Sequence, residues 1–173
     1  PDHARARNNL ARLLLAENRG GEAEVHLREA LRAEPGYWEA HYNLGVACQE
    51  SDRPHQALSH YGRVLDLQPR HADTHNNIGG VLLSLGRHAD AVWSYERALR
   101  AEPGHVDARW NRGLAQLALG EYEAGWDGYE ARLERKDVPA REFSMPRWNG
   151  ESLEGRSLLI WAEQGLGDTL QFL

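Results

Sequence analysis

The stretch Asn43-Leu44-Gly45 decides the fold, because it returns as Asn77-Ile78-Gly79 and again as Asn111-Arg112-Gly113, 34 residues further along each time. A weaker copy, Asn9-Leu10-Ala11, lies upstream. Four more columns keep the same interval: Ala23, Ala57, Ala91 and Gly125; Leu27, Tyr61, Tyr95 and Tyr129; Leu31, Leu65, Leu99 and Leu133; Pro35, Pro69 and Pro103. A fixed period of roughly 20–50 residues marks a repeat architecture, so the sequence predicts an array of repeated units.

The unit itself resembles a known repeat. A 34-residue unit carrying Leu-Gly, then Ala-x-x-x-Tyr, then Pro resembles the tetratricopeptide repeat. The resemblance implies an all-α fold, a right-handed solenoid of helix-turn-helix units. We expect four repeats, at about residues 4–37, 38–71, 72–105 and 106–139. In the second repeat, helices are predicted over 38–50 and 54–67, because Pro54 suits a first helical turn and Pro69 ends the second helix.

Two columns of small or flexible residues have structural explanations. Residues that tolerate left-handed backbone stand between the paired helices, at Asn18, Asp52, Gly86 and Gly120. A small residue recurs inside the first helix of each pair, at Ala11, Gly45, Gly79 and Gly113. A larger side chain there would hold the two helices of a repeat apart. Cys48 is expected to be a buried small hydrophobic residue and not a nucleophile.

Composition limits the function classes. Of 173 residues, 41% are hydrophobic and 27% charged, and the net charge is −6 with acids and bases interleaved, which disfavours nucleic acid as a partner. No apolar run approaches the roughly 18 residues of a membrane span, and no leader peptide is recognised. One cysteine excludes an internal disulfide, so we expect a cytoplasmic protein. Because the chain starts at Pro1 and stops inside an apolar run, we expect it to be a piece of a longer protein.

The asparagine column is the first functional candidate. Its position in a tetratricopeptide repeat implies a ladder along the concave groove, at Asn9, Asn43, Asn77 and Asn111. An amide both donates and accepts, so such a ladder can bind the backbone of an extended peptide without recognising its side chains. Neighbours on the same face could add side-chain preference: Tyr42, Asn76, Trp110 and Arg12. The alternative is that each asparagine bonds a neighbouring helix and only fixes the packing.

Histidines and acids invite other interpretations. His71 and His75, and the pair His41 and His75, lack the additional ligands of a tetrahedral site, so we predict no metal site. The acids Glu39, Asp73 and Asp107 open first helices, where they favour the positive end of the helix dipole.

The last third departs from the repeat pattern. In repeat four, Arg112 and Arg132 replace apolar residues, while Trp126 and Tyr129 add apolar surface that we expect the following residues to cover. The array is predicted to end at about 137, followed by a connector over 138–156. An apolar run, a glycine-rich turn and a helix start are then predicted over 157–173, as at the beginning of a Rossmann-like domain.

This tail is the second functional candidate. The run Glu163-Gln164-Gly165-Leu166-Gly167-Asp168 resembles the start of the catalytic region in bacterial tetratricopeptide-repeat glycosyltransferases of heptosyltransferase type. The repeats look like those of O-linked N-acetylglucosamine transferases. The resemblance implies that Gly165 and Gly167 shape a phosphate or acceptor loop and that Asp168 is the general base of inverting transfer. Alternatively, the glycines only shape a turn and Asp168 caps a helix.

Three function classes follow from the sequence. The first is a scaffold that binds an extended peptide or an acceptor protein in the groove, inactive as an enzyme and without a cofactor. In the second, the longer protein is a glycosyltransferase that uses a nucleotide sugar as donor. The third is self-association through the repeats alone. An unpaired strand over 157–162 must dock on the repeats, pair with another chain or stay mobile, and a homodimer through this strand is a further expectation.

Overall fold

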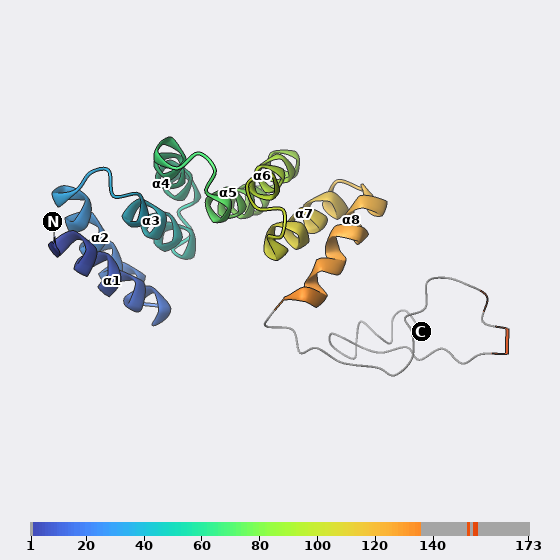
Figure 1. The fold of residues 1–173 in the computed structure, drawn as a ribbon, viewed down its shortest axis with the longest axis horizontal. Coiled ribbons are helices and arrows are strands. Elements are labelled where there is room, and N and C mark those ends of the chain that lie inside the picture. The colour runs from blue at the N-terminus through green and yellow to red at the C-terminus, as the bar shows by residue number, and fades with distance from the viewer. Residues whose placement is uncertain (1, 136–151, 153, 156–173) are drawn as a thin grey trace. The chain divides into compact units, whose positions relative to one another are not determined.

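The array consists of paired helices. The fold is given by a computed structural model that describes residues 2–135, 152, 154 and 155. The chain divides into two units, residues 1–139 and 140–173. The helices of the first unit are α1 (Asp2–Ala16), α2 (Gly20–Ala33), α3 (Trp38–Glu50), α4 (Pro54–Leu67), α5 (Ala72–Ser84), α6 (His88–Ala101), α7 (Val106–Ala118) and α8 (Tyr122–Tyr129), and the 3-10 turn η1 (Glu130–Glu134) follows them (Figure 1).

These bounds follow the sequence period. The first helices α3, α5 and α7 begin at Trp38, Ala72 and Val106, and the two helices predicted for the second repeat match α3 and α4. Each helix packs against the next one along the chain, most extensively within the pairs α1 and α2, α3 and α4, α5 and α6, and α7 and α8. All secondary structure among the described residues is helical, and the strand predicted over 157–162 lies outside them. None of the described helices has the length and apolarity needed to cross a membrane.

The turns within the pairs have left-handed backbone, as the sequence predicts. The φ angles are 59° at Asn18, 53° at Asp52, 73° at Gly86 and 80° at Gly120. The two non-glycine members are Asn and Asp, which tolerate this region better than other residues. The chain therefore reverses within three residues between the helices of a pair.

A glycine-aromatic contact holds the middle pairs together. A Cβ added to Gly45 would lie 2.4 Å from Cε1 of Tyr61, and one added to Gly79 would lie 2.5 Å from Cε1 of Tyr95. Both tyrosines are fully buried. The alanines of the second helices are buried too, at Ala23, Ala57 and Ala91. These contacts confirm the packing reason for the small column, because the aromatic ring occupies the space that a side chain would need.

The fourth repeat packs differently. A Cβ on Gly113 would lie 2.5 Å from the backbone nitrogen of Tyr129, so α7 meets backbone here and not an aromatic ring. The second helix α8 ends at Tyr129 and continues as η1. Trp126 is 57% exposed and stands edge-on to Tyr129, with ring centroids 5.6 Å apart. The segment expected to cover this face lies outside the described residues.

Candidate binding face

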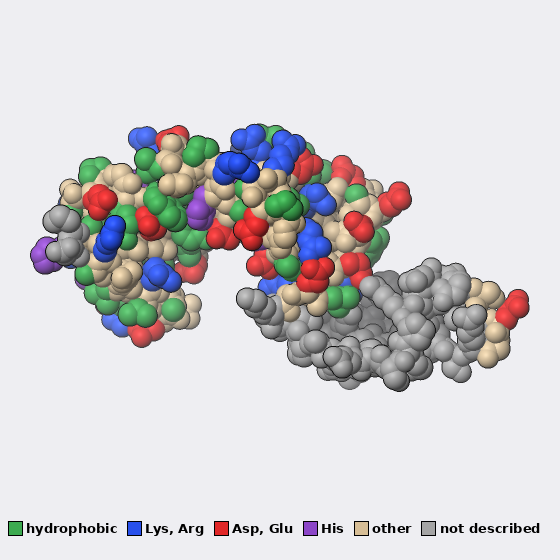
Figure 2. Space-filling view, viewed as in Figure 1, with side chains coloured by type: hydrophobic (Ala, Val, Ile, Leu, Met, Phe, Trp, Pro, Cys, Tyr) green, Lys and Arg blue, Asp and Glu red, His purple; other side chains and the backbone are tan. Residues whose placement is uncertain are grey.

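The candidate site is the surface formed by the first helix of each pair, α1, α3, α5 and α7, which we call the inner face. In Figure 1, α1, α3 and α5 lie on the lower side of the array, and Figure 2 shows the array hollowed beneath α5. The side chains of consecutive first helices contact one another directly, as the following bonds show. The inner face is therefore one continuous surface across the repeats.

The asparagine ladder links the repeats through its amide nitrogens. Asn43 Nδ2 donates to Asn8 Oδ1 at 2.7 Å, and both residues are buried. Asn111 Nδ2 donates to Asn76 Oδ1 at 3.0 Å. Each bond joins a first helix to the one before it, 35 residues earlier in the sequence. The ladder therefore fixes the packing between repeats, and Asn8 is a member that the sequence analysis missed.

Asn77 is the centre of a larger network. Its Nδ2 donates to the Tyr42 hydroxyl at 3.1 Å and to the Tyr61 hydroxyl at 3.4 Å. The Tyr61 hydroxyl donates in turn to Gln49 Oε1 at 3.0 Å. Burial raises the pKa of Tyr42, and the nearby carboxylate of Asp73 raises it further. Both hydroxyls therefore stay protonated and act as hydrogen-bonding groups.

Two amide oxygens of the ladder are not bonded to other protein groups that the structure describes. Within the described residues, Asn43 Oδ1 and Asn111 Oδ1 have no hydrogen-bond partner, and neither belongs to the buried polar atoms that lack one. Both oxygens are thus in contact with solvent. Asn9 is exposed and makes no hydrogen bond in the described part of the chain, where no repeat precedes it. The inner face can accept hydrogen bonds from a ligand at the asparagines more readily than it can donate them.

The other predicted groove residues are distributed along this face. Arg12 is exposed on α1, and Tyr42 and Asn76 belong to the network and to the ladder. Trp110, on α7, stacks under the guanidinium of Arg135 at 4.2 Å from its ring centroid. Arg135 also pairs with Asp107 at 2.8 Å. The fourth repeat therefore closes its part of the inner face with internal contacts.

Tyr95 differs from its equivalent Tyr61. The Tyr95 side chain is fully buried, and its hydroxyl has no hydrogen-bond partner among the described residues. The partners of Tyr61 are Gln49 and Asn77, and the equivalent residues one repeat later are Leu83 and Asn111. Leu83 cannot form a hydrogen bond, and Asn111 bonds Asn76 instead. The Tyr95 hydroxyl lies 4.0 Å from where a Cβ on Gly80 would be. Comparing the columns one repeat apart would have exposed this mismatch in the sequence.

The histidines have structural roles. Nδ1 of His71 and of His105 accepts the backbone N–H of Thr74 and of Ala108, each at 3.2 Å, and so caps α5 and α7. His75 Nε2 donates to the Pro69 carbonyl at 2.9 Å. In the described ranges, no three His, Cys, Asp or Glu side chains gather as a metal site would require.

Cys48 is buried and burial raises the pKa of its thiol, as expected for a core residue. The sulfur lies 3.8 Å from Gln56 Oε1. A protonated, enclosed thiol is a poor nucleophile. The structure thus supports the prediction that Cys48 is a small hydrophobic core residue.

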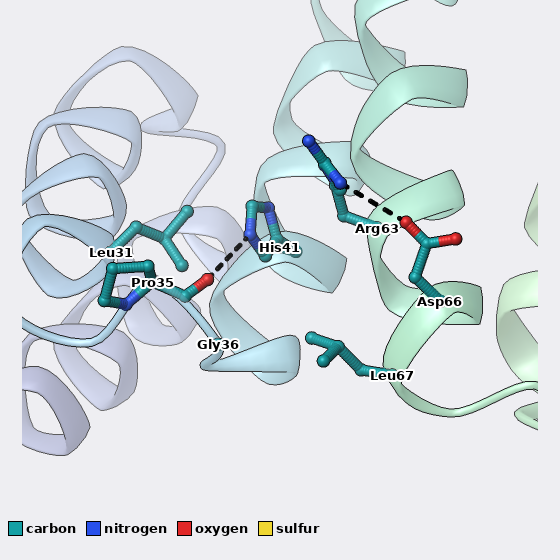
Figure 3. Close-up of a pocket in the computed structure, with 7 residues that line it drawn as sticks. All are labelled: Leu31, Pro35, Gly36, His41, Arg63, Asp66 and Leu67. Atoms are coloured by element: carbon teal, nitrogen blue, oxygen red, sulfur yellow. Dashed lines mark hydrogen bonds and ion pairs between the residues drawn. The ribbon is translucent and has the colours of Figure 1, made fainter.

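A separate hollow of about 430 Å³ lies among the ends of α2, α3 and α4 (Figure 3). Its polar side chains are engaged with one another or with the backbone: His41 Nε2 donates to the Pro35 carbonyl at 3.3 Å, and Arg63 pairs with Asp66 at 3.4 Å. On its other side, His41 Nδ1 lies 3.3 Å from Nδ1 of His60. The hollow is shallow and partly apolar, and it offers no free catalytic group.

The predicted catalytic residues lie elsewhere. Gly165, Gly167 and Asp168 fall outside the described residues, so their roles stay predictions. The same holds for the connector over 138–156, of which only residues 152, 154 and 155 are described.

Comparison with known proteins agrees with the fold. A model described as tetratricopeptide repeat matches residues 37–103, and a second with the same description matches residues 9–49 and 90–137. Protein FlbA of Caulobacter vibrioides is 44% identical over 50 residues, which are 28% of this chain and 8% of FlbA. The chain thus spans less than a tenth of that relative.

Solved structures are similar over most of the array. PilF of Pseudomonas aeruginosa has a TM-score of 0.72 at 26% identity, covering 80% of this chain and 63% of PilF. MamA of Desulfovibrio magneticus RS-1 has a TM-score of 0.69 at 25% identity, covering 78% and 76%.

Two more distant structures share the fold alone. The O-GlcNAc transferase of Thermobaculum terrenum has a TM-score of 0.64 at 23% identity and covers 66% of this chain and 22% of its own. The first repeat domain of RPAP3, bound to an HSP90 peptide, has a TM-score of 0.66 at 18% identity and covers 69% and 94%.

Proposed function

The chain belongs to the tetratricopeptide-repeat family, and we propose that its inner face binds an extended peptide segment of a partner protein. The observation that carries the proposal is the row of inner-face asparagines: the amide nitrogens of Asn43, Asn77 and Asn111 are tied to neighbouring repeats, while the oxygens of Asn43 and Asn111 have no partner among the described residues. Acceptors held in place in this way suit the backbone N–H groups of an extended peptide. The RPAP3 domain, which shares the fold, is bound to a peptide.

The inter-repeat bonds support this proposal. Because the amide nitrogens are already bonded, the acceptors are held in place before the ligand arrives, and little side-chain entropy is lost on binding. Gly80 adds space at the centre of the face, since a Cβ there would meet nothing closer than Gln49 Nε2 at 3.7 Å. The two roles that the sequence left open for the asparagines, packing and peptide binding, are therefore compatible.

A display library of random 12-residue peptides tests the proposal. Selected peptides should bind the full chain, and Gly80→Trp should weaken their binding at least tenfold by filling the inner face. The matched control is Gly62→Trp on α4, where an added Cβ also meets nothing within 4 Å. Failure to select any binder, or equal losses in both variants, would contradict peptide binding at the inner face.

Sugar transfer by a longer protein stays a prediction, because it depends on residues 163–168. Titration of UDP-, ADP- and GDP-sugars into the longer protein and its Asp168→Asn variant would test it. Loss of turnover in the variant, with donor binding kept, is the expected result. Absence of donor binding in the longer protein would contradict it.

Self-association, including pairing through the predicted strand over 157–162, also stays a prediction. The mass in solution of a chain ending at about residue 140 distinguishes the two routes. Monomers would exclude self-association through the repeats.

A further inference from the structure

The middle of the inner face is acidic and largely uncompensated. Glu39 and Glu50 on α3 make no hydrogen bond or ion pair in the described part of the chain, and Asp73 on α5 contacts only His105, at 3.2 Å from Nε2. Figure 2 shows Asp and Glu side chains gathered along the lower edge of the array beneath α3 and α5.

The acidic stretch has limits on both sides. In repeat one, Arg5 stands where the other repeats have Glu39, Asp73 and Asp107, and Arg12 is exposed on the same helix. In repeat four, Asp107 is neutralised by Arg135. Unpaired negative charge on the inner face is thus concentrated in repeats two and three.

The unpartnered Tyr95 hydroxyl lies in the same region. It lies 4.0 Å from where a Cβ on Gly80 would be, and among the described residues it is buried without a hydrogen bond. A buried polar group without a partner is costly, and in a native protein it calls for an explanation such as a ligand. The hydroxyl is closed to solvent, so a ligand reaches it only when neighbouring side chains move.

We infer that the segment bound by the inner face is basic, with Lys or Arg side chains against Glu39, Glu50 and Asp73 and one N–H donor on the Tyr95 hydroxyl beside Gly80. This inference rests on the proposed function and names the chemistry of its ligand. The charged groups that the middle of the face offers are the carboxylates of Glu39, Glu50 and Asp73, and the Asn43 oxygen and the Tyr95 hydroxyl can add acceptors. Ammonium and guanidinium groups carry only donors and a positive charge, so they match this set.

Three fluorescein-labelled 12-residue peptides of alternating sequence, Lys-Ser, Gln-Ser and Glu-Ser, test the inference by fluorescence anisotropy with the full chain. We expect the Lys-Ser peptide to bind about tenfold more tightly than the Gln-Ser peptide, and the Glu-Ser peptide not to bind. Raising the salt concentration should weaken the Lys-Ser complex, because the screening length shrinks to about 8 Å near physiological salt.

Matched variants locate the site. The triple variant Glu39→Gln, Glu50→Gln, Asp73→Asn should weaken Lys-Ser binding about tenfold. The control Asp66→Asn, Asp90→Asn, Glu123→Gln removes the same charge from second helices and should leave the affinity within about twofold. Tyr95→Phe should weaken binding about fivefold without lowering the urea midpoint of unfolding.

The outcomes separate the two proposals. If Gln-Ser or Glu-Ser peptides bind as tightly as Lys-Ser, or if both triple variants lose affinity equally, the basic ligand is wrong and the peptide-binding face stands. If none of the three peptides binds although library peptides do, the inference of a basic ligand is overturned and the proposed peptide binding stands. A library without binders overturns the proposed function and this inference together.

Discussion

Repeats two and three share a glycine-tyrosine contact and differ in the hydrogen bonding of the tyrosine hydroxyl. In each, a fully buried tyrosine fills the space beside a glycine, Gly45 for Tyr61 and Gly79 for Tyr95. The Tyr61 hydroxyl bonds Gln49 and Asn77, while the Tyr95 hydroxyl bonds nothing. Both repeats therefore need the tyrosine ring to fill the space beside the glycine. The bonding of the tyrosine hydroxyl differs between the two repeats, so this group can take part in binding without loss of the shared packing.

The largest expected effect tests the glycine-tyrosine packing that repeats two and three share. Gly45→Ala and Gly79→Ala should each lower the free energy of unfolding by roughly 2–3 kcal/mol, because the new methyl group meets a buried tyrosine ring. Urea denaturation measures the change. Gly62→Ala is the control and should raise stability by about 1 kcal/mol, since its site is open and alanine favours helix. A large difference between the Gly45 and Gly79 variants would show that the two contacts are not equivalent.

A smaller effect is expected from the ladder. Asn77→Ala should cost about 1–2 kcal/mol, because it removes the donor shared by the Tyr42 and Tyr61 hydroxyls. Asn111→Ala should cost about 1 kcal/mol or less, because it breaks one part-buried bond to Asn76. Thermal unfolding with calorimetry distinguishes the two. Equal losses of stability in the two variants would mean that the bond from Asn77 to Tyr61 adds no stability. The difference drawn between the Tyr61 and Tyr95 hydroxyls would then be weakened.

The smallest effect is a dependence on pH. Burial lowers the pKa of His41 and His60 in repeat two and of His75 in repeat three. The folded state therefore takes up protons less readily than the unfolded state. This contribution to stability is complete above the unfolded histidine pKa of about 6.5 and is lost as the pH falls through that value toward the lowered folded values. Urea unfolding at pH 7.5, 6.0 and 5.0 should show a modest decline.

His41→Gln should reduce that decline, because it removes one half-buried titrating group that contacts Pro35 and His60. His88→Gln, at the first residue of α6, is the matched control and should leave it unchanged. Stability that rises on acidification between pH 7.5 and 5.0 would reverse the assigned direction.

The 34-residue period predicts most of the array. Residues such as Gly45, Asp52 and Pro54 have local reasons for their positions, so helix pairs and turns follow from sequence columns alone. The bonding of the asparagines does not follow in this way. Asn43 meets Asn8 across 35 residues, a partner one position away from its own column, and only the superhelical stacking brings the two amides together. Likewise, the Tyr95 hydroxyl lacks a hydrogen bond because Leu83 has no polar group and Asn111 bonds Asn76, and the period alone does not predict this.

The most direct test of this account compares Tyr61→Phe with Tyr95→Phe by urea unfolding of the otherwise unchanged chain. Tyr61→Phe should lower the free energy of unfolding by about 1 kcal/mol, because it removes the hydrogen bonds of the Tyr61 hydroxyl to Gln49 and Asn77, although Asn77 keeps its bond to Tyr42. Tyr95→Phe should leave the free energy of unfolding unchanged or raise it by up to about 1 kcal/mol, because it removes a buried group that bonds nothing. If Tyr95→Phe costs as much as Tyr61→Phe, the Tyr95 hydroxyl is satisfied within the free protein and is not available to a ligand.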